Sequence, residues 1–326
     1  MKKSKNVFLI LCLVAAALAL WALSFMFENA PAHRERPAMA ASEDRPQMVS
    51  NVLTLASARS PLTNAIARPL KSEIPSRLKP ILERNNSLQT RLAALRGLVS
   101  PLAFSEVQAL YAFLYETATE TGLSQGNLNA LKNDLLNRLK SQEGETIPLI
   151  RHLMNLYYDP LQDEVWREYC VQHLGTVFQK APLCQPQLVQ LFDDALNQKE
   201  GSMAGTTLIA MNRNVGLAGW SAETLAEKAW TVAKSPTYNA ASRTTALQIA
   251  ARRGDRRTLP LARAILEEKR DAHLMVSALA VLGQLGEAQD RQLLDAFSAS
   301  GDIRLRGAAV AALSHQRHAS TTDSNE

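Results

Sequence analysis

The sequence has few cysteines, few glycines and few aromatic residues. Its 326 residues include three cysteines and 14 glycines, and 6% of them are aromatic. No Asn-Gly or Asp-Gly dipeptide joins two stretches of alternating polarity, which argues against β-hairpins. Apolar residues make up 46% of the chain, enough to bury a core without a framework of disulfide bonds. The composition therefore predicts an all-α protein.

Motifs that carry catalysis or hold a cofactor are also missing. The chain contains no GxSxG, GxxxxGK[ST], HExxH or CxxCH, the spacings of nucleophile, phosphate, zinc and c-type haem sites. His152 and His173 could face each other from adjacent helices, but no third ligand completes a metal site. Each is better interpreted as a core histidine bonded to a backbone carbonyl. We therefore expect no catalytic residues, no cofactor and no metal, in a protein that is not an enzyme.

The cysteines are not placed to form a disulfide bond. Cys170 lies on an apolar helical stripe, as a small buried hydrophobe would. Cys184 follows the far end of the same helix, and a disulfide bond needs Cα atoms within about 7 Å. Cys12 lies in an apolar N-terminal run. We predict no bond between Cys170 and Cys184.

Charge of one sign is in excess only at the N-terminus. The net charge is +5, but Lys2, Lys3 and Lys5 supply three of the 36 basic residues, leaving 33 against 31 acidic ones. This near-neutral remainder argues against a dedicated nucleic-acid-binding protein. The densest charge is RRGDRR at 252–257. This run either forms a basic surface for an anionic partner or complements a helix C-terminus, and the second interpretation is favoured.

An uncharged run of 21 residues, 7–27, follows the lysines. A membrane-spanning helix needs about 20 apolar residues, whereas the apolar part of a signal peptide has about 7–15. Length thus favours an uncleaved signal-anchor over a cleaved signal peptide in 1–27, with a buried cytosolic helix as a third alternative. By the positive-inside rule the rest of the chain faces the periplasm, or is secreted to it if cleavage occurs. Residues 28–73 are rich in proline and alanine and predict a linker.

The rest of the chain repeats one helical pattern. In 271–286, DAHLMVSALAVLGQLG, the residues Leu274, Ala278 and Leu282 form one apolar stripe. Asp271 is placed to cap the helix, and Gly283 and Gly286 suit close packing and a C-terminal stop. Degenerate copies begin at Asp163, Asn239 and Asp302.

A second helix type alternates with the first. TIPLIRHLM (146–154) and TLPLARAIL (258–266) share a threonine cap, a proline in the first turn and an arginine at the sixth position, Arg151 and Arg263. Two helix types alternating every 31–40 residues predict an α-solenoid. The expected helices span 87–99, 105–117, 127–140, 146–159, 163–179, 187–198, 201–214, 221–234, 239–253, 258–269, 271–285, 288–298 and 302–315.

These patterns resemble HEAT repeats. DIRLRGAAVAAL (302–313) and SALAVLGQLGE (277–287) are similar to the short HEAT-like repeats common in bacterial proteins. The resemblance is good over 239–316, fair over 146–177 and poor elsewhere. It implies a right-handed α-solenoid of about six helix pairs over 74–316, followed by a disordered tail, 317–326.

The resemblance also implies a function, because HEAT-like proteins are mostly scaffolds and adaptors. It implies an exported, membrane-anchored scaffold that binds a protein or peptide partner, with the membrane contacted through 7–27 and nucleic acid not expected. In that family the second helix of each pair lines the concave face, which nominates Arg151 and Arg263. Tyr157 and Tyr158 are candidate aromatic anchors at an interface. The alternatives are a HEAT-like enzyme or enzyme subunit, lyase- or glycosylase-like, and a structural spacer of the cell envelope.

Overall fold

The computed structural model describes residues 73–322, with side chains described as far as residue 316. These residues belong to the compact unit Leu62–Glu326. The predicted anchor, 7–27, and the predicted linker up to residue 72 lie outside the described residues.

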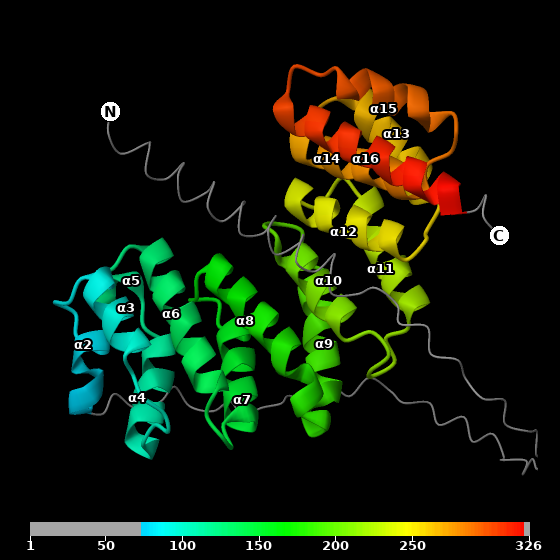
Figure 1. The fold of residues 1–326 in the computed structure, drawn as a ribbon. Helices are drawn as coiled ribbons and strands as arrows, with labels where there is room; N and C mark the ends of the chain where they lie inside the picture. The colour runs from blue at the N-terminus through cyan, green and yellow to red at the C-terminus, as the bar shows by residue number, and fades with distance from the viewer. Residues whose placement is uncertain (1–72, 323–326) are drawn as a thin grey trace, which may run out of the picture. The chain divides into compact units, whose positions relative to one another are not determined.

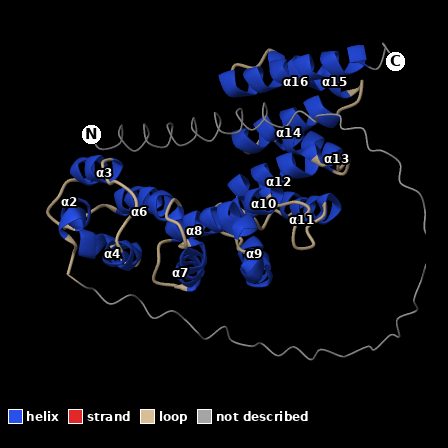
Figure 2. Ribbon diagram, turned by 60° about the horizontal axis from the view of Figure 1, so that its bottom comes forward, coloured by secondary structure: helices blue, strands red, loops and turns tan. Residues whose placement is uncertain are grey.

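The described residues form fifteen α-helices and no strand (Figure 2). The prediction of an all-α fold is therefore confirmed. The helices are α2 (Lys79–Leu82), α3 (Leu88–Arg96), α4 (Phe104–Leu114), α5 (Ala118–Thr121), α6 (Gln125–Lys140), α7 (Thr146–Tyr158), α8 (Glu164–Val177), α9 (Gln185–Leu196), α10 (Met203–Arg213), α11 (Ala222–Lys234), α12 (Ala240–Arg252), α13 (Thr258–Glu268), α14 (Ala272–Leu285), α15 (Asp290–Ser298) and α16 (Ile303–Thr322). Short 3-10 helices are η1 (Ser76–Leu78), η2 (Phe178–Lys180) and η3 (Pro182–Cys184).

The predicted helix starts are confirmed where an acidic or amide side chain caps the first turn. The carboxylate of Asp271 accepts hydrogen bonds from the backbone N–H groups of His273 and Leu274 at 2.8 and 2.9 Å. Asp163 and Asn239 cap α8 and α12 in the same way. Asp302 accepts from the N–H group of Arg304 at the start of α16. These caps fix where one helix type begins.

The threonine caps predicted for the second helix type are wrong by one residue, whereas Ser87 and Ser221 cap α3 and α11 at the expected starts of these helices. Thr146 and Thr258 are the first helical residues, and the hydroxyl of Thr258 donates back to the carbonyl of Asp255. The helix α4 begins before Ser105, because the carboxylate of Glu106 accepts from the N–H group of Ala103. At the other end of the chain, α16 continues to Thr322, into the range predicted to be a disordered tail.

The helices are arranged as a HEAT-like helical repeat (Figure 1). Consecutive even-numbered helices from α6 to α16 pack side by side, and the odd-numbered helices α7 to α15 lie against them. Each odd-numbered helix packs most extensively against the even-numbered helix that follows it, as α11 does against α12. The sequence predicted the opposite pairing, in which α12 joins α13. The repeating unit is therefore shifted by one helix.

In three of these pairs an arginine near the start of the even-numbered helix bonds to the chain at or just after the end of the preceding helix. Arg167 donates from Nε to the carbonyl of Tyr157, at the end of α7, at 2.7 Å. Arg243 makes the corresponding bond to the carbonyl of Ala233 in α11 at 3.1 Å. Arg306 reaches the carbonyl of Ser300, just after α15, at 2.9 Å. Each bond satisfies a carbonyl at or beyond a helix end that has no partner within its own helix.

Glycines let neighbouring even-numbered helices approach closely. A β-carbon built on Gly175 of α8 would lie 2.6 Å from the β-carbon of Ala210 in α10, and one on Gly283 of α14 would lie 2.7 Å from the α-carbon of Ala312 in α16. The side chain of Asn214 then donates across this contact to the carbonyl of Gly175 at 2.9 Å. The predicted use of Gly283 for close packing is confirmed.

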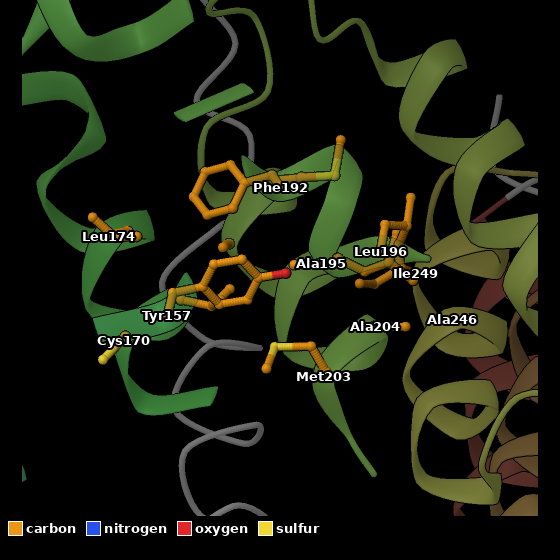
Figure 3. Packing of buried hydrophobic residues seen from close by; sticks show 14 of the residues in the cluster. Tyr157, Cys170, Leu174, Phe192, Ala195, Leu196, Met203, Ala204, Ala246 and Ile249 are labelled. Atoms are coloured by element: carbon orange, nitrogen blue, oxygen red, sulfur yellow. The ribbon is translucent and has the colours of Figure 1, made fainter. Parts of the chain in front are cut away.

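Cys170 lies in the core between these helices (Figure 3). Its side chain is fully buried, near Leu174 and Tyr157, and burial raises the pKa of its thiol. Cys170 and Cys184 are both free thiols, so the prediction of no disulfide bond between them is confirmed.

Candidate interaction surfaces

The outward side of α7 carries two of the residues nominated from the sequence, Arg151 and Tyr158. They lie seven positions apart, which places them on one side of a helix. Arg151 is exposed and has no hydrogen-bond or ion-pair partner within the described residues. The ring of Tyr158 is 51% exposed, and its hydroxyl donates to the carboxylate of Asp194 in α9 at 3.2 Å. Both side chains are therefore open to a partner.

Apolar side chains extend this surface around the turn from α7 to α8. Leu161 is 84% exposed and Val165 is 50% exposed. The turn itself is ordered by Asp159, whose carboxylate accepts from the N–H group of Leu161 at 2.9 Å. We call Arg151, Tyr158, Leu161 and Val165 the α7 face. It combines a free cation with three exposed apolar or aromatic side chains.

The guanidinium of Arg263 forms ion pairs within the chain. Its Nε lies 2.7 Å from Oδ1 of Asp290 in α15, and a second nitrogen lies 3.1 Å from a carboxylate oxygen of Glu287. Burial acts to raise the pKa of Asp290, but the hydrogen bonds from Arg263 and from the backbone N–H group of Glu287, together with the positive charge of Arg263, hold that pKa below its usual value. Arg263 joins α13 to α15, and we do not include it in a partner surface.

Tyr157 is also part of the packing. Its side chain is 1% exposed, and the guanidinium of Arg167 lies over its ring at 5.4 Å. Of the nominated residues, Arg151 and Tyr158 are exposed on α7, Tyr157 is buried, and Arg263, whose side chain is 30% exposed, forms ion pairs within the chain. Burial and long-range ion pairing decide this, and neither is visible in the local sequence.

The basic run at 252–257 is largely paired within the chain. Arg256 lies 2.7 Å from Glu287, and Arg257 lies 2.6 Å from Glu227 and 2.7 Å from Asp255. Arg253 donates to the side-chain oxygen of Asn212 at 2.6 Å. Arg256 and Arg257 are thus neutralised by carboxylates of the chain, whereas Arg253 bonds to a neutral amide.

The two candidate core histidines are buried, but side chains rather than backbone carbonyls are their closest partners. Nδ1 of His152 lies 3.1 Å from the hydroxyl of Tyr115, and its ring stacks on Tyr111 at 4.1 Å. Nε2 of His173 lies 2.8 Å from Oδ1 of Asn133. Burial lowers the pKa of His152 to about 4 and that of His173 to about 3. Among the described residues no group of three His, Cys, Asp or Glu side chains is placed to hold a metal ion.

The long loop between α10 and α11, 214–221, is held in place by an aromatic cluster that the sequence analysis did not anticipate. Trp220 is 3% exposed and stacks on Phe178 at 4.9 Å, with Phe192 at 5.5 Å. The N–H group of Gly216 donates to the carbonyl of Trp220 at 2.7 Å. A tryptophan at the end of a glycine-rich loop was the available signal, since such a side chain gains most from burial.

A cavity of about 300 Å³ lies between α3 and α6. It is lined by Leu95, Arg96, Asp134, Asn137, Arg138 and Ser141. Arg138 is already engaged, since it donates to the carbonyl of Leu95 at 3.3 Å. The cavity brings together no pair of groups arranged for acid–base chemistry.

Helix pairs stacked in chain order define the fold of this chain as an all-α, HEAT-like helical repeat. No protein-family model matches the chain, and no curated protein matches it. Among solved structures it is similar to that of human deoxyhypusine hydroxylase in complex with glycerol, with 15% sequence identity over 74% of this chain and 95% of that chain, at a TM-score of 0.31.

Two expectations are corrected at this point. The expectation that the chain is not an enzyme is withdrawn, because the matched structure is by its name that of a hydroxylase. At 15% identity and a TM-score of 0.31, the likeness transfers no reaction to this chain. The expected membrane-anchored location is not kept as a conclusion: no helix within 73–322 is both long and apolar enough to cross a membrane, and the expected anchor, 7–27, lies outside those residues.

Proposed function

We propose that this chain is a helical-repeat scaffold that binds a protein or peptide partner through the α7 face. The observation that carries the proposal is the exposure of Tyr158 and of Arg151, a cation without an internal partner, on one side of α7, with Leu161 and Val165 exposed in the turn and helix start that follow. Interfaces take most of their binding energy from a few tyrosine, tryptophan and arginine side chains that become buried on binding. The α7 face offers two side chains of these types.

The α7 face fits a segment that presents an apolar side chain next to a carboxylate. Tyr158 is held by its bond to Asp194, so little side-chain entropy is lost when a partner covers its ring. Arg151 is free to form a bidentate pair with a carboxylate. The name of the matched solved structure is in line with the alternative of an enzyme or enzyme subunit, but it supplies no candidate catalytic residue here.

Affinity capture with matched variants tests the proposal. The full-length protein would be compared with the double variant Arg151→Ala/Leu161→Ser, which alters the α7 face. The matched control is Arg84→Ala/Leu183→Ser, which removes an equally exposed cation and leucine elsewhere. We expect a stoichiometric partner that is retained by the control and lost from the α7 variant. A partner retained by both variants, or lost from both, would contradict the proposal.

A further inference from the structure

Three cations gather where the even-numbered helices α6, α8 and α10 end. Lys140 is the last residue of α6, Lys180 ends the 3-10 helix that follows α8, and Arg213 is the last residue of α10. These helices are neighbours in the packed layer (Figure 1). In the chain, α7 connects α6 to α8, and α9 connects α8 to α10. Burial lowers the pKa of Lys140, and the charges of Arg213 and Lys180 lower it further, so both of these cations lie within electrostatic reach of Lys140. We call them the basic edge.

No acidic side chain of the described residues neutralises this edge. Lys140, Lys180 and Arg213 form no hydrogen bond or ion pair within 73–316. The segments 169–192 and 201–222, which contain the ends of α8 and α10 and the connections that follow, include no aspartate or glutamate.

The corresponding connections later in the chain are built differently. The connection after α12 contains Asp255, and the one after α14 contains Glu287 and leads to Asp290. Each of these acids pairs with an arginine of the same region. Helix dipoles favour a cation at any helix C-terminus. Helix dipoles do not explain why acidic residues are missing only from the connections after α8 and α10. The cations there repel one another.

The backbone at the basic edge is held by the aromatic cluster of Phe178, Phe192 and Trp220. Phe178 lies two residues before Lys180, and its ring stacks on Trp220 at 4.9 Å. Trp220 ends the loop that Arg213 begins, and Asn214 is anchored by its bond to the carbonyl of Gly175. A fixed backbone lowers the entropy that the cations lose when they bind a ligand.

We propose that the basic edge binds an acidic peptide segment, whose carboxylates pair with Lys140, Lys180 and Arg213. Neighbouring packed helices lie about 8–10 Å apart, and an extended chain advances about 3.1 Å per residue. The acidic residues of an extended segment that carries one at every third position are therefore separated by about the distance between neighbouring helices. Nucleic acid fits less well, because the chain beyond its first lysines is nearly neutral, with 33 basic and 31 acidic residues. This site uses other side chains than the α7 face and does not depend on it.

Fluorescence anisotropy of a labelled peptide tests the proposal. The probe is a nine-residue peptide with glutamate at every third position and alanine elsewhere, added to the full-length protein at low salt. The triple variant Lys140→Gln/Lys180→Gln/Arg213→Gln removes the edge, and Lys79→Gln/Arg84→Gln/Arg291→Gln removes three exposed cations elsewhere. Exposed ion pairs each contribute little, so we expect about tenfold weaker binding for the edge variant and less than twofold for the control. The single variant Lys180→Glu, at an exposed position, serves if the triple variant does not fold.

Three results would overturn the proposal. The first is unchanged binding in both edge variants. Equal loss in the control variant is the second, since it would show that net charge alone attracts the peptide. The third is tighter binding of a labelled oligothymidylate of equal length, lost in the same variants, which would identify a nucleic-acid surface. Weaker binding of a peptide with its three glutamates adjacent would support the proposed spacing.

Discussion

At the scale of single residues, Gly175 and Gly283 occupy positions at which there is no room for a β-carbon. Both face an alanine of the next even-numbered helix, and a β-carbon on either would lie under 3.0 Å from it. We predict that Gly175→Ala and Gly283→Ala each destabilise the protein by about 1–3 kcal/mol, because the helices must move apart. Denaturant unfolding measures this. Gly126→Ala in α6, where nothing lies within 4 Å, is the control and should be neutral or slightly stabilising; equal loss there would refute the packing argument.

The buried histidines make stability depend on pH. An unfolded histidine takes up a proton near pH 6.5, whereas folded His152 and His173 do so only near pH 4 and pH 3, because burial disfavours their charged form. The unfolded state therefore binds more protons in this range, so stability is full above about pH 6.5 and falls as the pH falls toward 4.

We predict a lower urea midpoint at pH 5 than at pH 7. His173→Gln should reduce the slope of stability with pH by at most about 1.4 kcal/mol per pH unit. Replacing the exposed His273 with Gln should leave the slope as it is. Equal slopes for the wild type and His173→Gln would show that His173 does not contribute.

Residue roles were predictable where the deciding partner is close in sequence. The caps formed by Asp271 and Asn239 bond to N–H groups two or three residues away, so a local pattern identifies them. The partner of Arg263 lies 27 residues further along the chain, and the burial of Tyr157 depends on packing between helices. A local pattern therefore could not show that Arg263 is ion-paired within the chain or that Tyr157 is buried.

At the scale of helices, the pair of Arg263 and Asp290 joins α13 to α15. The side chain of Asp290 is 3% exposed, so its charge depends on the arginine for compensation. We predict that Arg263→Met lowers the free energy of unfolding by about 1–3 kcal/mol, since a buried carboxylate is left without its partner.

Arg256→Met is the matched control for this prediction. Arg256 pairs with Glu287, and both side chains are largely exposed, so its loss should cost less than about 1 kcal/mol. Chemical denaturation of both variants measures the difference. If the two variants lose equal stability, Asp290 does not depend on Arg263.

Helix positions were predicted well and helix pairing was not. Apolar periodicity and caps located most of the helices within a few residues. The pairing of α11 with α12 rests on contacts such as that of Arg243 with the carbonyl of Ala233, which no periodicity encodes. The sequence pattern repeats equally well whichever helix is taken as the first of a unit.

At the scale of the whole described chain, extensive contacts join only helices that are near neighbours in chain order. In a protein of this kind each repeat is stabilised by its contacts with its neighbours. A local defect therefore lowers the stability of the adjacent repeats most. We predict that Gly283→Ala accelerates amide hydrogen exchange in α13 to α16 and leaves α6 to α8 unchanged, as measured by mass spectrometry. Uniform acceleration over all helices would show a single cooperative unit instead.

The candidate surfaces were predictable only in part at this scale. Arg151 and Tyr158 were nominated from the second helix of a repeat and from aromatic character, and both are exposed. The basic edge was not anticipated, because Lys140, Lys180 and Arg213 lie far apart in sequence and meet only when α6, α8 and α10 stack. The absence of acidic residues from 169–192 and 201–222 is visible in the sequence once the stacking is known.

The burial of Trp220 against Phe178 and Phe192 has a consequence for the fluorescence of this tryptophan. An indole held at 3% exposure in an apolar cluster should emit at shorter wavelength than one in water. Since the loop that ends at Trp220 begins beside Arg213, its fluorescence would respond if that loop were lifted from α8 and α9. With the other three tryptophans of the chain replaced, Trp220 would be an intrinsic reporter next to the basic edge, one that follows its local order without any attached label.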